Sequence, residues 1–249
     1  MLQPLSLCIM RNFYLSLLLL CLTAASHAGV IIGGTRFIYH EGQKSLGVTL
    51  RNTSNRTWLV NTTLYSNGKW AGTLAPMAKQ NPARLSAVPP LFSLKPGREN
   101  SLRIIQTSAD LPKDRETLFT LSVAAIPSGH ANGNAVQMAV RTNLKLIYRP
   151  SGLKGESREA WRQLKWIRQA HGLQVSNPTP YYVTLFNLSF NGHAHPDAGV
   201  VAPYSQRTFT DCQATAGCLV KWQTLNDFGK IMPVATAAPS AFANPRSDD

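Results

Sequence analysis

Three cations stand out because they open or interrupt segments that otherwise have the composition of apolar strands. Lys145 and Arg149 lie in an apolar run that ends at Pro150, and Arg36 opens an earlier run of Phe, Ile and Tyr. A cation that is buried or half-buried needs an anionic partner, because desolvating an unpaired charge is costly. One interpretation is therefore an anion-binding site. The other is a set of ordinary strand-edge cations whose charged heads reach solvent.

The segment that carries Lys145 begins as a strand with two unlike faces. Val136, Met138 and Val140 alternate with Gln, Ala and Arg, which is the period of a β-strand exposed on one side. These three side chains either form an apolar edge for a partner or face the core of their own domain. Alternation alone does not separate the two interpretations.

The sequence lacks the patterns that mark a catalytic centre. It has no nucleophile elbow, no zinc-binding H-E-x-x-H and no phosphate-binding loop. His193 and His195 form an H-x-H pair, but no third ligand is apparent, so a plain exposed loop is favoured. We expect a protein that is not an enzyme and that holds no cofactor and no metal.

The amino terminus resembles a cleaved export signal. Arg11 precedes an apolar run that is too short to span a bilayer, which needs ~20 residues, and small residues follow at positions 26 and 28. Residues 1–28 are therefore predicted to be a secretory signal peptide, and no later segment is predicted to enter a membrane. Its removal leaves 24 basic and 12 acidic residues, a net charge of +12, which attracts anionic partners. The scatter of these cations argues against nucleic-acid binding.

Two cysteines, Cys212 and Cys218, remain after the leader is removed. An exported chain meets an oxidising compartment, so a disulfide between them is expected. Their spacing fits neither a zinc pair nor a C-x-x-C redox motif.

Short runs rich in Val, Ile, Thr, Tyr and Phe alternate with turn residues, which predicts an all-β fold of sandwiches. The expected strands are Arg36–Tyr39, Ser45–Asn52, Trp58–Tyr65, Ser101–Ile105, Leu118–Ala125, Val136–Tyr148, Leu173–Ser176 and Tyr182–Phe190. Residues 159–169 fit either a short helix or a strand. Strand patterns stop near 149–152 and resume about ten residues later, so residues 29–150 and 151–234 are predicted to be two immunoglobulin-like domains. Residues 235–249 are rich in Ala, Pro and Ser and are expected to be a disordered tail.

Several motifs resemble those of the PapD-like periplasmic chaperones of pilus assembly. They occur in the family's order over nearly all of residues 30–233. The motifs are Thr35-Arg36-Phe37-Ile38-Tyr39, Pro89-Pro90-Leu91-Phe92, Leu111-Pro112-Lys113-Asp114-Arg115-Glu116, Ala125-Ile126-Pro127, Leu144-Lys145-Leu146-Ile147-Tyr148-Arg149-Pro150, Asn177-Pro178-Thr179-Pro180-Tyr181-Tyr182 and Leu225-Asn226-Asp227-Phe228-Gly229.

The resemblance implies two immunoglobulin-like domains set at an angle, with a cleft between them that binds a pilus subunit. It implies that Arg36 and Lys145 bind the subunit's C-terminal carboxylate, and that Thr35 adds a hydroxyl. Two converging cations can compensate one desolvated carboxylate. Val136, Met138 and Val140 match the family's donor-strand residues, which complete a subunit that lacks its last strand.

A further charged set, Glu116, Arg149 and Asp227, matches residues that orient the two domains in the family. The short connection from Pro127 to Ala135 is similar to that of the subfamily with a short loop before the donor strand. The chain is thus expected to be a periplasmic chaperone that delivers subunits to an outer-membrane usher and that can self-associate when free. The alternative function is an immunoglobulin-like adhesin or a structural pilus subunit.

Overall fold

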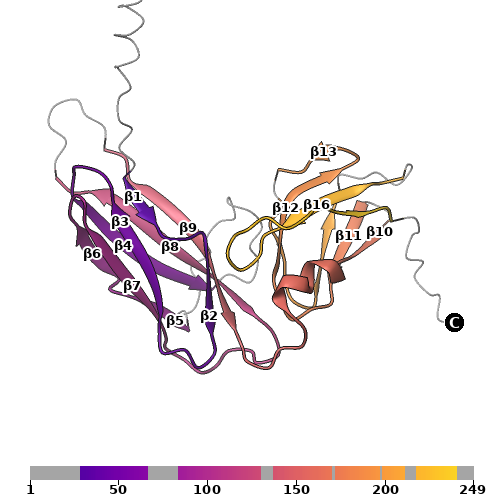
Figure 1. The fold of residues 1–249 in the computed structure, drawn as a ribbon, viewed down its shortest axis with the longest axis horizontal. Coiled ribbons are helices and arrows are strands. Elements are labelled where there is room, and N and C mark those ends of the chain that lie inside the picture. Colours follow the sequence, from indigo (N-terminus) through magenta and orange to yellow (C-terminus); the bar gives the residue numbers. More distant parts are fainter. Residues whose placement is uncertain are drawn as a thin grey trace, which may run out of the picture.

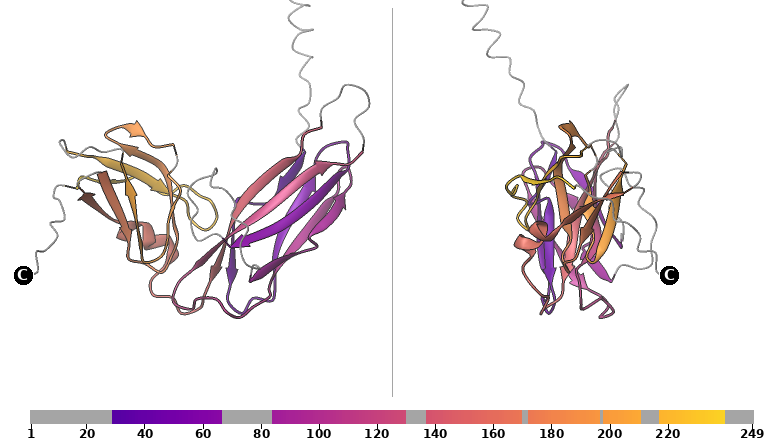
Figure 2. Two further views of the ribbon diagram at one scale, coloured as in Figure 1. Left: turned by 180° about the vertical axis from the view of Figure 1, so that it is seen from behind. Right: turned by 90° about the vertical axis from the view of Figure 1, so that its right-hand side faces the viewer.

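The computed structural model describes residues 29–66, 84–129, 137–169, 172–196, 198–210 and 217–239. Its strands form two separate groups, one from residues 30–149 and one from residues 165–237. The groups are two lobes joined at an angle, so that the molecule is bent (Figures 1 and 2). The predicted all-β architecture is confirmed. Within the described residues, no helix is long enough and apolar enough to cross a membrane.

The first group is a sandwich of two sheets. The four-stranded sheet has the order β1 (Val30–Ile32), β3 (Leu46–Asn52), β7 (Glu99–Gln106) and β5 (Leu85–Val88). The five-stranded sheet has the order β2 (Arg36–His40), β9 (Val140–Arg149), β8 (Thr117–Pro127), β4 (Trp58–Ser66) and β6 (Leu91–Leu94). Its strands are antiparallel except for β2 and β9, which run parallel.

Alternate residues of these strands bury the core between the two sheets. Leu50 and Leu102 from one sheet meet Leu121 and Leu146 from the other, and all four are fully buried. Because side chains on a strand alternate between faces, the residues between them point outward. Lys145, Ile147 and Arg149 are therefore on the outer face of the five-stranded sheet, which is the face toward the second domain.

The second group packs around aromatic side chains. One sheet has the order β10 (Lys165–Gln169), β11 (Gly172–Asn177) and β15 (Ser205–Phe209). The other has the order β13 (His193–Ala194), β12 (Val183–Phe190), β16 (Val220–Thr224) and β17 (Ala235–Ala237), with β14 (Val200–Val201) also paired to β12. Trp166 contacts the rings of Phe190, Phe209 and Trp222 across the interior.

The same buried asparagine turn occurs in both domains. Asn52 at the end of β3 accepts hydrogen bonds from the amide and the hydroxyl of Ser54. Asn177 at the end of β11 does the same for Thr179. Each asparagine also donates to carbonyl groups of its own domain, so the chain reversal after the strand is fully hydrogen-bonded. The repetition indicates that the two domains are built on a common plan.

The expected strands are found, but the bounds of three predicted segments differ from the structure. All eight predicted strands are present, but the strand expected from Val136 begins at Val140. Residues 159–169 contain both alternatives, a 3-10 helix at Ser157–Gln163 followed by β10. The tail prediction is wrong for Ala235–Ala237. This segment pairs with β16 and packs on the core, because main-chain pairing needs no apolar periodicity. Residues 240–249 and 1–28 lie outside the described chain.

A small apolar cluster joins the domains near the bend. Leu118 and Ile147 of the five-stranded sheet pack against Val200 of the second domain, with Ile38 and Tyr182 beside them. This apolar contact holds the two lobes against each other on the outer face of the five-stranded sheet. It lies on the same face as Lys145.

Candidate functional site

The parallel pairing of β2 with β9 places Arg36 directly beside Lys145. Their Cα atoms are register partners, and both side chains are half-buried on the outer face of the sheet. Arg36 is the first residue of β2, which follows the turn at Gly33 and Gly34. The backbone pairing therefore sets the two cations on neighbouring positions of one sheet face.

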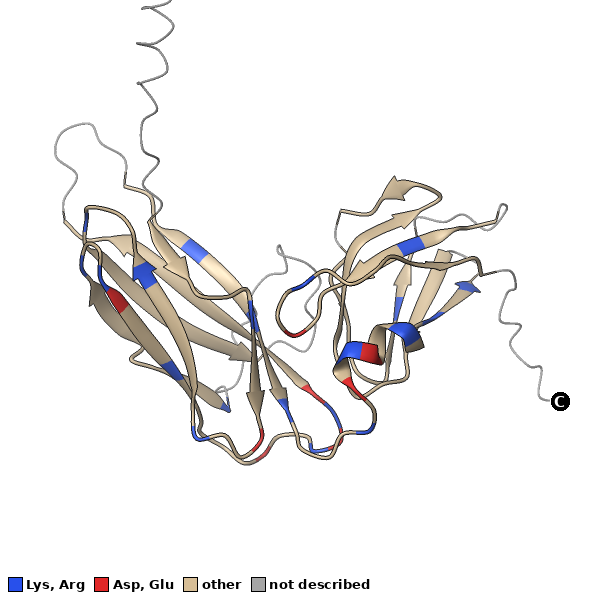
Figure 3. Ribbon diagram, in the orientation of Figure 1, with Lys and Arg blue, Asp and Glu red and all other residues tan. Residues whose placement is uncertain are grey.

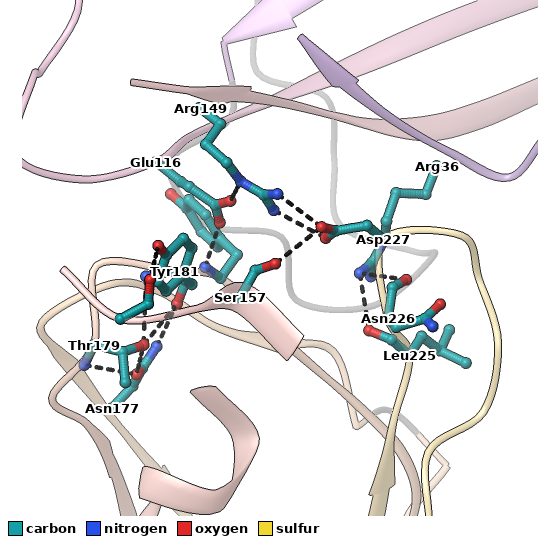
Figure 4. Close-up of polar contacts among 12 residues, drawn as sticks. Arg36, Glu116, Arg149, Ser157, Asn177, Thr179, Tyr181, Leu225, Asn226 and Asp227 are labelled. Atoms are coloured by element: carbon teal, nitrogen blue, oxygen red, sulfur yellow. Dashed lines mark hydrogen bonds and ion pairs between the residues drawn. The ribbon is translucent and has the colours of Figure 1, made fainter. Parts of the chain in front are cut away.

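Arg36 also contacts the second domain (Figure 4). Its Nη1 donates to the carbonyl oxygens of Leu225 at 3.1 Å and Asn226 at 3.4 Å, and its Nη2 donates to the hydroxyl of Thr184. Burial lowers the pKa of Arg36 below its usual value, while Asp227 and Glu116 oppose that shift. Desolvation makes the cation a stronger partner for an incoming anion than a solvated arginine would be.

Thr35 is the residue before Arg36 and lies at the surface, beside the loop that contacts Arg36. It is exposed, and a side chain added at Gly229 would approach the Thr35 hydroxyl oxygen to 3.3 Å. Gly229 also has a φ of 78°, which favours glycine. The loop from Leu225 to Gly229 is thus closely fitted against Thr35 and Arg36.

The second charged set, Glu116, Arg149 and Asp227, joins residues of both domains (Figure 4). Arg149 donates from Nε to Glu116 at 2.6 Å and from both Nη atoms to Asp227 at 2.7 and 2.9 Å. The guanidinium also stacks 5.5 Å from the ring centre of Tyr181. Ser157 donates to Asp227 at 2.9 Å. A bidentate pair of this kind fixes the orientation as well as the distance of its partners.

Glu116 links two segments of the chain at the domain junction. Its carboxylate accepts from the Tyr182 amide at 2.7 Å, and its own amide donates to Pro180. The side chain is only 1% exposed, and this burial raises its pKa against the pull of Arg149. Burial alone would also raise the pKa of Asp227, but Arg149 and Ser157 hold that pKa below its usual value. Most acidic residues lie along the bottom of the bend and at this junction, with one on the far side of the first lobe, whereas basic residues are spread over both domains (Figure 3).

The first part of β9 has an open edge. β2 pairs only with residues 145–149 of β9, and on that side no described strand pairs with residues 140–144. Met138 and Val140 have the orientation of core residues such as Leu144, yet they are 73% and 55% exposed. They line a cavity of about 620 Å³ that also contacts Trp58, Val123 and Ala125. The apolar side chains thus face a groove, not a closed core.

Two of the predicted residues lie outside the described chain. Val136 and Cys212 fall in segments that the structure does not describe. Cys218 is buried in the second core and is disulfide-bonded. The pairing of Cys212 with Cys218 and the role of Val136 stay predictions.

The two histidines of the H-x-H pair occupy a surface position and a ring-packing position. His193 is the exposed first residue of β13, and the ring of His195 packs edge-on against Phe190 and Phe209. Among the described residues, no group of three or more His, Cys, Asp or Glu is placed to hold a metal ion.

Contacts from several residues of the second domain were missed by sequence reasoning. Thr184, Ser157 and the carbonyl groups of Leu225 and Asn226 all bind the charged residues. Leu225 and Asn226 lie inside a recognised motif. Their contacts to Arg36 use main-chain carbonyl groups, which every residue has, so the residue types could not predict them. Ser157 carries no sequence signal that distinguishes it from other surface serines.

Comparison with known proteins identifies the family. Residues 29–154 match the PapD N-terminal domain of pili and flagellar-assembly chaperones, and residues 159–236 match the C-terminal domain of the pili assembly chaperone PapD. The chain belongs to the PapD family of pilus-assembly chaperones. The match supports a chaperone rather than an enzyme, and it confirms two immunoglobulin-like domains.

Full-length relatives agree with this assignment. The chain is 47% identical over 205 residues to the uncharacterized fimbrial chaperone YcbF of Escherichia coli K12, covering 82% of this chain and 86% of the relative. It is 34% identical to the chaperone protein FimC of the same strain, with 94% of both chains covered.

Solved structures show the same fold. The periplasmic chaperone SfaE matches with a TM-score of 0.69 at 30% identity, covering 84% of this chain and 98% of SfaE. The SafB chaperone complex with the SafA pilin of Salmonella enterica contains a chain that matches with a TM-score of 0.72 at 27% identity, covering 86% and 98%.

Proposed function

We propose that this protein captures pilus subunits by binding the carboxylate of their last residue between Arg36 and Lys145. The observation that carries the proposal is the β2–β9 register, which sets two half-buried cations side by side at the junction of the domains. A carboxylate that enters this site loses water, and two nearby cations compensate that loss. Thr35 at the entrance supplies an additional hydroxyl.

The open edge of β9 provides the second part of the binding surface. A strand of the subunit adds to residues 137–144 by main-chain hydrogen bonds, and Val136, Met138 and Val140 fill apolar positions in its incomplete core. The exposure of Met138 and Val140 beside an apolar groove supports this donor role over packing in their own core. The related SafB chaperone forms a complex with a pilin, which supports the same class of partner.

The remaining features fit export and assembly at the outer membrane. We propose a signal peptide at residues 1–28, chaperone domains at 29–150 and 151–234, a Cys212–Cys218 disulfide and a periplasmic location, as for the periplasmic relative SfaE. We also propose membership of the short-loop subfamily and delivery of the bound subunit to an usher. In the absence of a subunit, the open edge of β9 can pair with a second copy of the chain.

Substitution of the two cations tests the carboxylate anchor. Arg36→Ala or Lys145→Ala is expected to abolish recovery of pilus subunits with the tagged protein from periplasm, as identified by mass spectrometry. Arg103→Ala is the matched control, because Arg103 is an exposed cation on β7. Normal recovery by both variants would refute the anchor.

The stoichiometry of the recovered species separates a chaperone from an adhesin. A chaperone yields a 1:1 complex with a subunit, which is measured by size-exclusion chromatography with light scattering. An adhesin or structural subunit would polymerise or bind a surface glycan instead.

A further inference from the structure

The two anchor cations belong to a longer row of side chains across the sheet. Arg36 pairs with Lys145, Lys145 pairs with Thr120 on β8, and Thr120 pairs with Tyr65 on β4. Residues that are directly opposite each other on neighbouring strands have Cβ atoms about 5 Å apart and share a face. Thr120 is therefore the next side chain after Lys145, on the same outer face.

The hydroxyl of Thr120 is buried without a hydrogen-bond partner. The residue is 1% exposed, and its Oγ1 is the one hydroxyl among the buried unpartnered side-chain atoms of the described residues. Other buried threonines are satisfied: Thr62 donates to carbonyl groups of Pro89 and Pro90, and Thr179 donates to Asn177. Buried polar groups are rarely left unpaired, so an exception beside a proposed binding site suggests a missing ligand.

Arg36 has only part of its donor capacity left for a ligand. A guanidinium carries five N–H groups, and contacts to Leu225, Asn226 and Thr184 already occupy both Nη atoms. A carboxylate has about four acceptor positions, all of which lose water when it is buried. A further donor close to Lys145 would satisfy one of them.

We propose that the Thr120 hydroxyl is a third contact of the anion site and donates a hydrogen bond to the carboxylate of the bound subunit. The inference rests on the proposed function, because it assigns one more residue to the same site. Lys145 and Tyr65, its neighbours in the row, are half-buried. The carboxylate held by Lys145 reaches Thr120 when the Tyr65 side chain moves aside. Thr120 is thus a binding residue that is covered in the free protein.

The competing explanation is that Thr120 serves only as a β-branched strand residue. Threonine fits a pleated strand well, and its hydroxyl would then contribute nothing to binding. The two explanations differ in what Thr120→Val does. This substitution keeps the shape of the side chain and removes only the hydroxyl.

The test uses two forms of one probe. A synthetic nonapeptide of alternating valine and serine, labelled at its amino end, is made with a free C-terminal carboxylate and as the C-terminal amide. Fluorescence polarisation gives the affinity of each form for the purified protein. In the unsubstituted protein the acid is expected to bind more tightly than the amide.

Thr120→Val is expected to reduce affinity for the acid about tenfold and to leave affinity for the amide unchanged, because the lost bond is to a charged group. Thr120→Ser keeps a hydroxyl and should retain the preference. Thr62→Val is the matched control, because it removes a hydroxyl on the opposite face of the same sheet. It should leave the ratio of acid to amide affinity unchanged.

Thermal unfolding controls for folding. Thr120→Val should melt no lower than the unsubstituted protein, since the hydroxyl it removes is unpaired. If the unsubstituted protein prefers the acid and Thr120→Val keeps the same preference, the inference about Thr120 is wrong while the anchor stands. If the unsubstituted protein binds acid and amide equally, the proposed anchor itself fails.

Discussion

Two arginines at the junction differ in how completely their charge is matched. Arg149 has two carboxylates within 3 Å and is 14% exposed, so it is a satisfied structural cation. Arg36 binds carbonyl and hydroxyl oxygens, which carry no full charge. Arg36 interacts with the charges of Asp227 and Glu116 only electrostatically. In the proposed site, this less directly paired arginine and Lys145 bind the anion together.

Asp227 provides a prediction about pH. Its pKa is below its usual value in the folded protein, so the unfolded chain takes up a proton first as the pH falls. The stabilisation by Asp227 is therefore full above the ordinary Asp pKa of about 4 and is lost as the pH falls through the lower folded value. Urea unfolding between pH 7 and pH 3 should show a loss of stability that is smaller in Asp227→Asn.

At pH 7, Asp227→Asn should itself lower the free energy of unfolding by about 1–2 kcal/mol, because it weakens a charged hydrogen-bond pair that is partly exposed. Parallel curves for the two proteins below pH 5 would show that Asp227 does not titrate in this way.

At the scale of elements, β9 serves three purposes along its length. Its first residues form the open edge, Lys145 is in the middle, and Ile147 and Arg149 contact the second domain. β9 has these different parts because β2 is short and pairs with only the last five residues of β9. One strand thus joins the binding surface directly to the domain junction.

Met138 tests the proposed donor role. Met138→Asp should weaken subunit binding at least tenfold, because in the proposed donor role a carboxylate would have to enter the apolar core of the subunit. The free protein should stay folded, since Met138 is 73% exposed. Resistance of a coexpressed subunit to protease measures the effect.

Gln137→Asp is the matched control for that experiment, because it places the same charge on the adjacent, exposed residue of the opposite face. Equal protection by Met138→Asp and by the unsubstituted protein would exclude Met138 as a donor residue.

The sequence predicts much of β9 but not its neighbours. Alternation at Val136, Met138 and Val140 predicted a strand in this segment, although β9 begins only at Val140, and the face that carries Lys145 was not predicted. The open edge depends on where β2 begins to pair with β9. This is a pairing between distant segments, which leaves no local pattern in the sequence. Strands of two or three residues, such as β14 and β17, are too short to show any period. Thr120 was missed because an unpaired hydroxyl is recognisable only when its surroundings are known.

At the scale of the whole molecule, the two domains are connected by polar and apolar contacts that lie close together. The Glu116–Arg149–Asp227 set lies beside the cluster of Leu118, Ile147 and Val200, so the bend is braced near the linker. The bend in turn positions the loop that contacts Arg36. The geometry of the anion site therefore depends on the angle between the domains.

Arg149→Met tests this dependence. It leaves Glu116 buried without its cation, so the free energy of unfolding should fall by about 3 kcal/mol or more. Small-angle X-ray scattering should show a larger radius of gyration as the domains separate. Arg84→Met is the control, because the Arg84–Asp110 pair is exposed and should contribute less than about 1 kcal/mol.

An unchanged radius of gyration for Arg149→Met, together with a loss of stability no greater than that of Arg84→Met, would show that the charged set does not brace the bend.

The parallel alignment of β2 with β9 also has a consequence for biogenesis. Arg36 and Lys145 come from the beginning and the end of the first domain, and they become neighbours only when the two strands have docked. Pairings between distant segments form late and slowly in β proteins. In the proposed mechanism, a copy whose β2 has not yet docked on β9 lacks the paired cations that hold a subunit. Only a chaperone with a completely folded first domain would then bind a subunit.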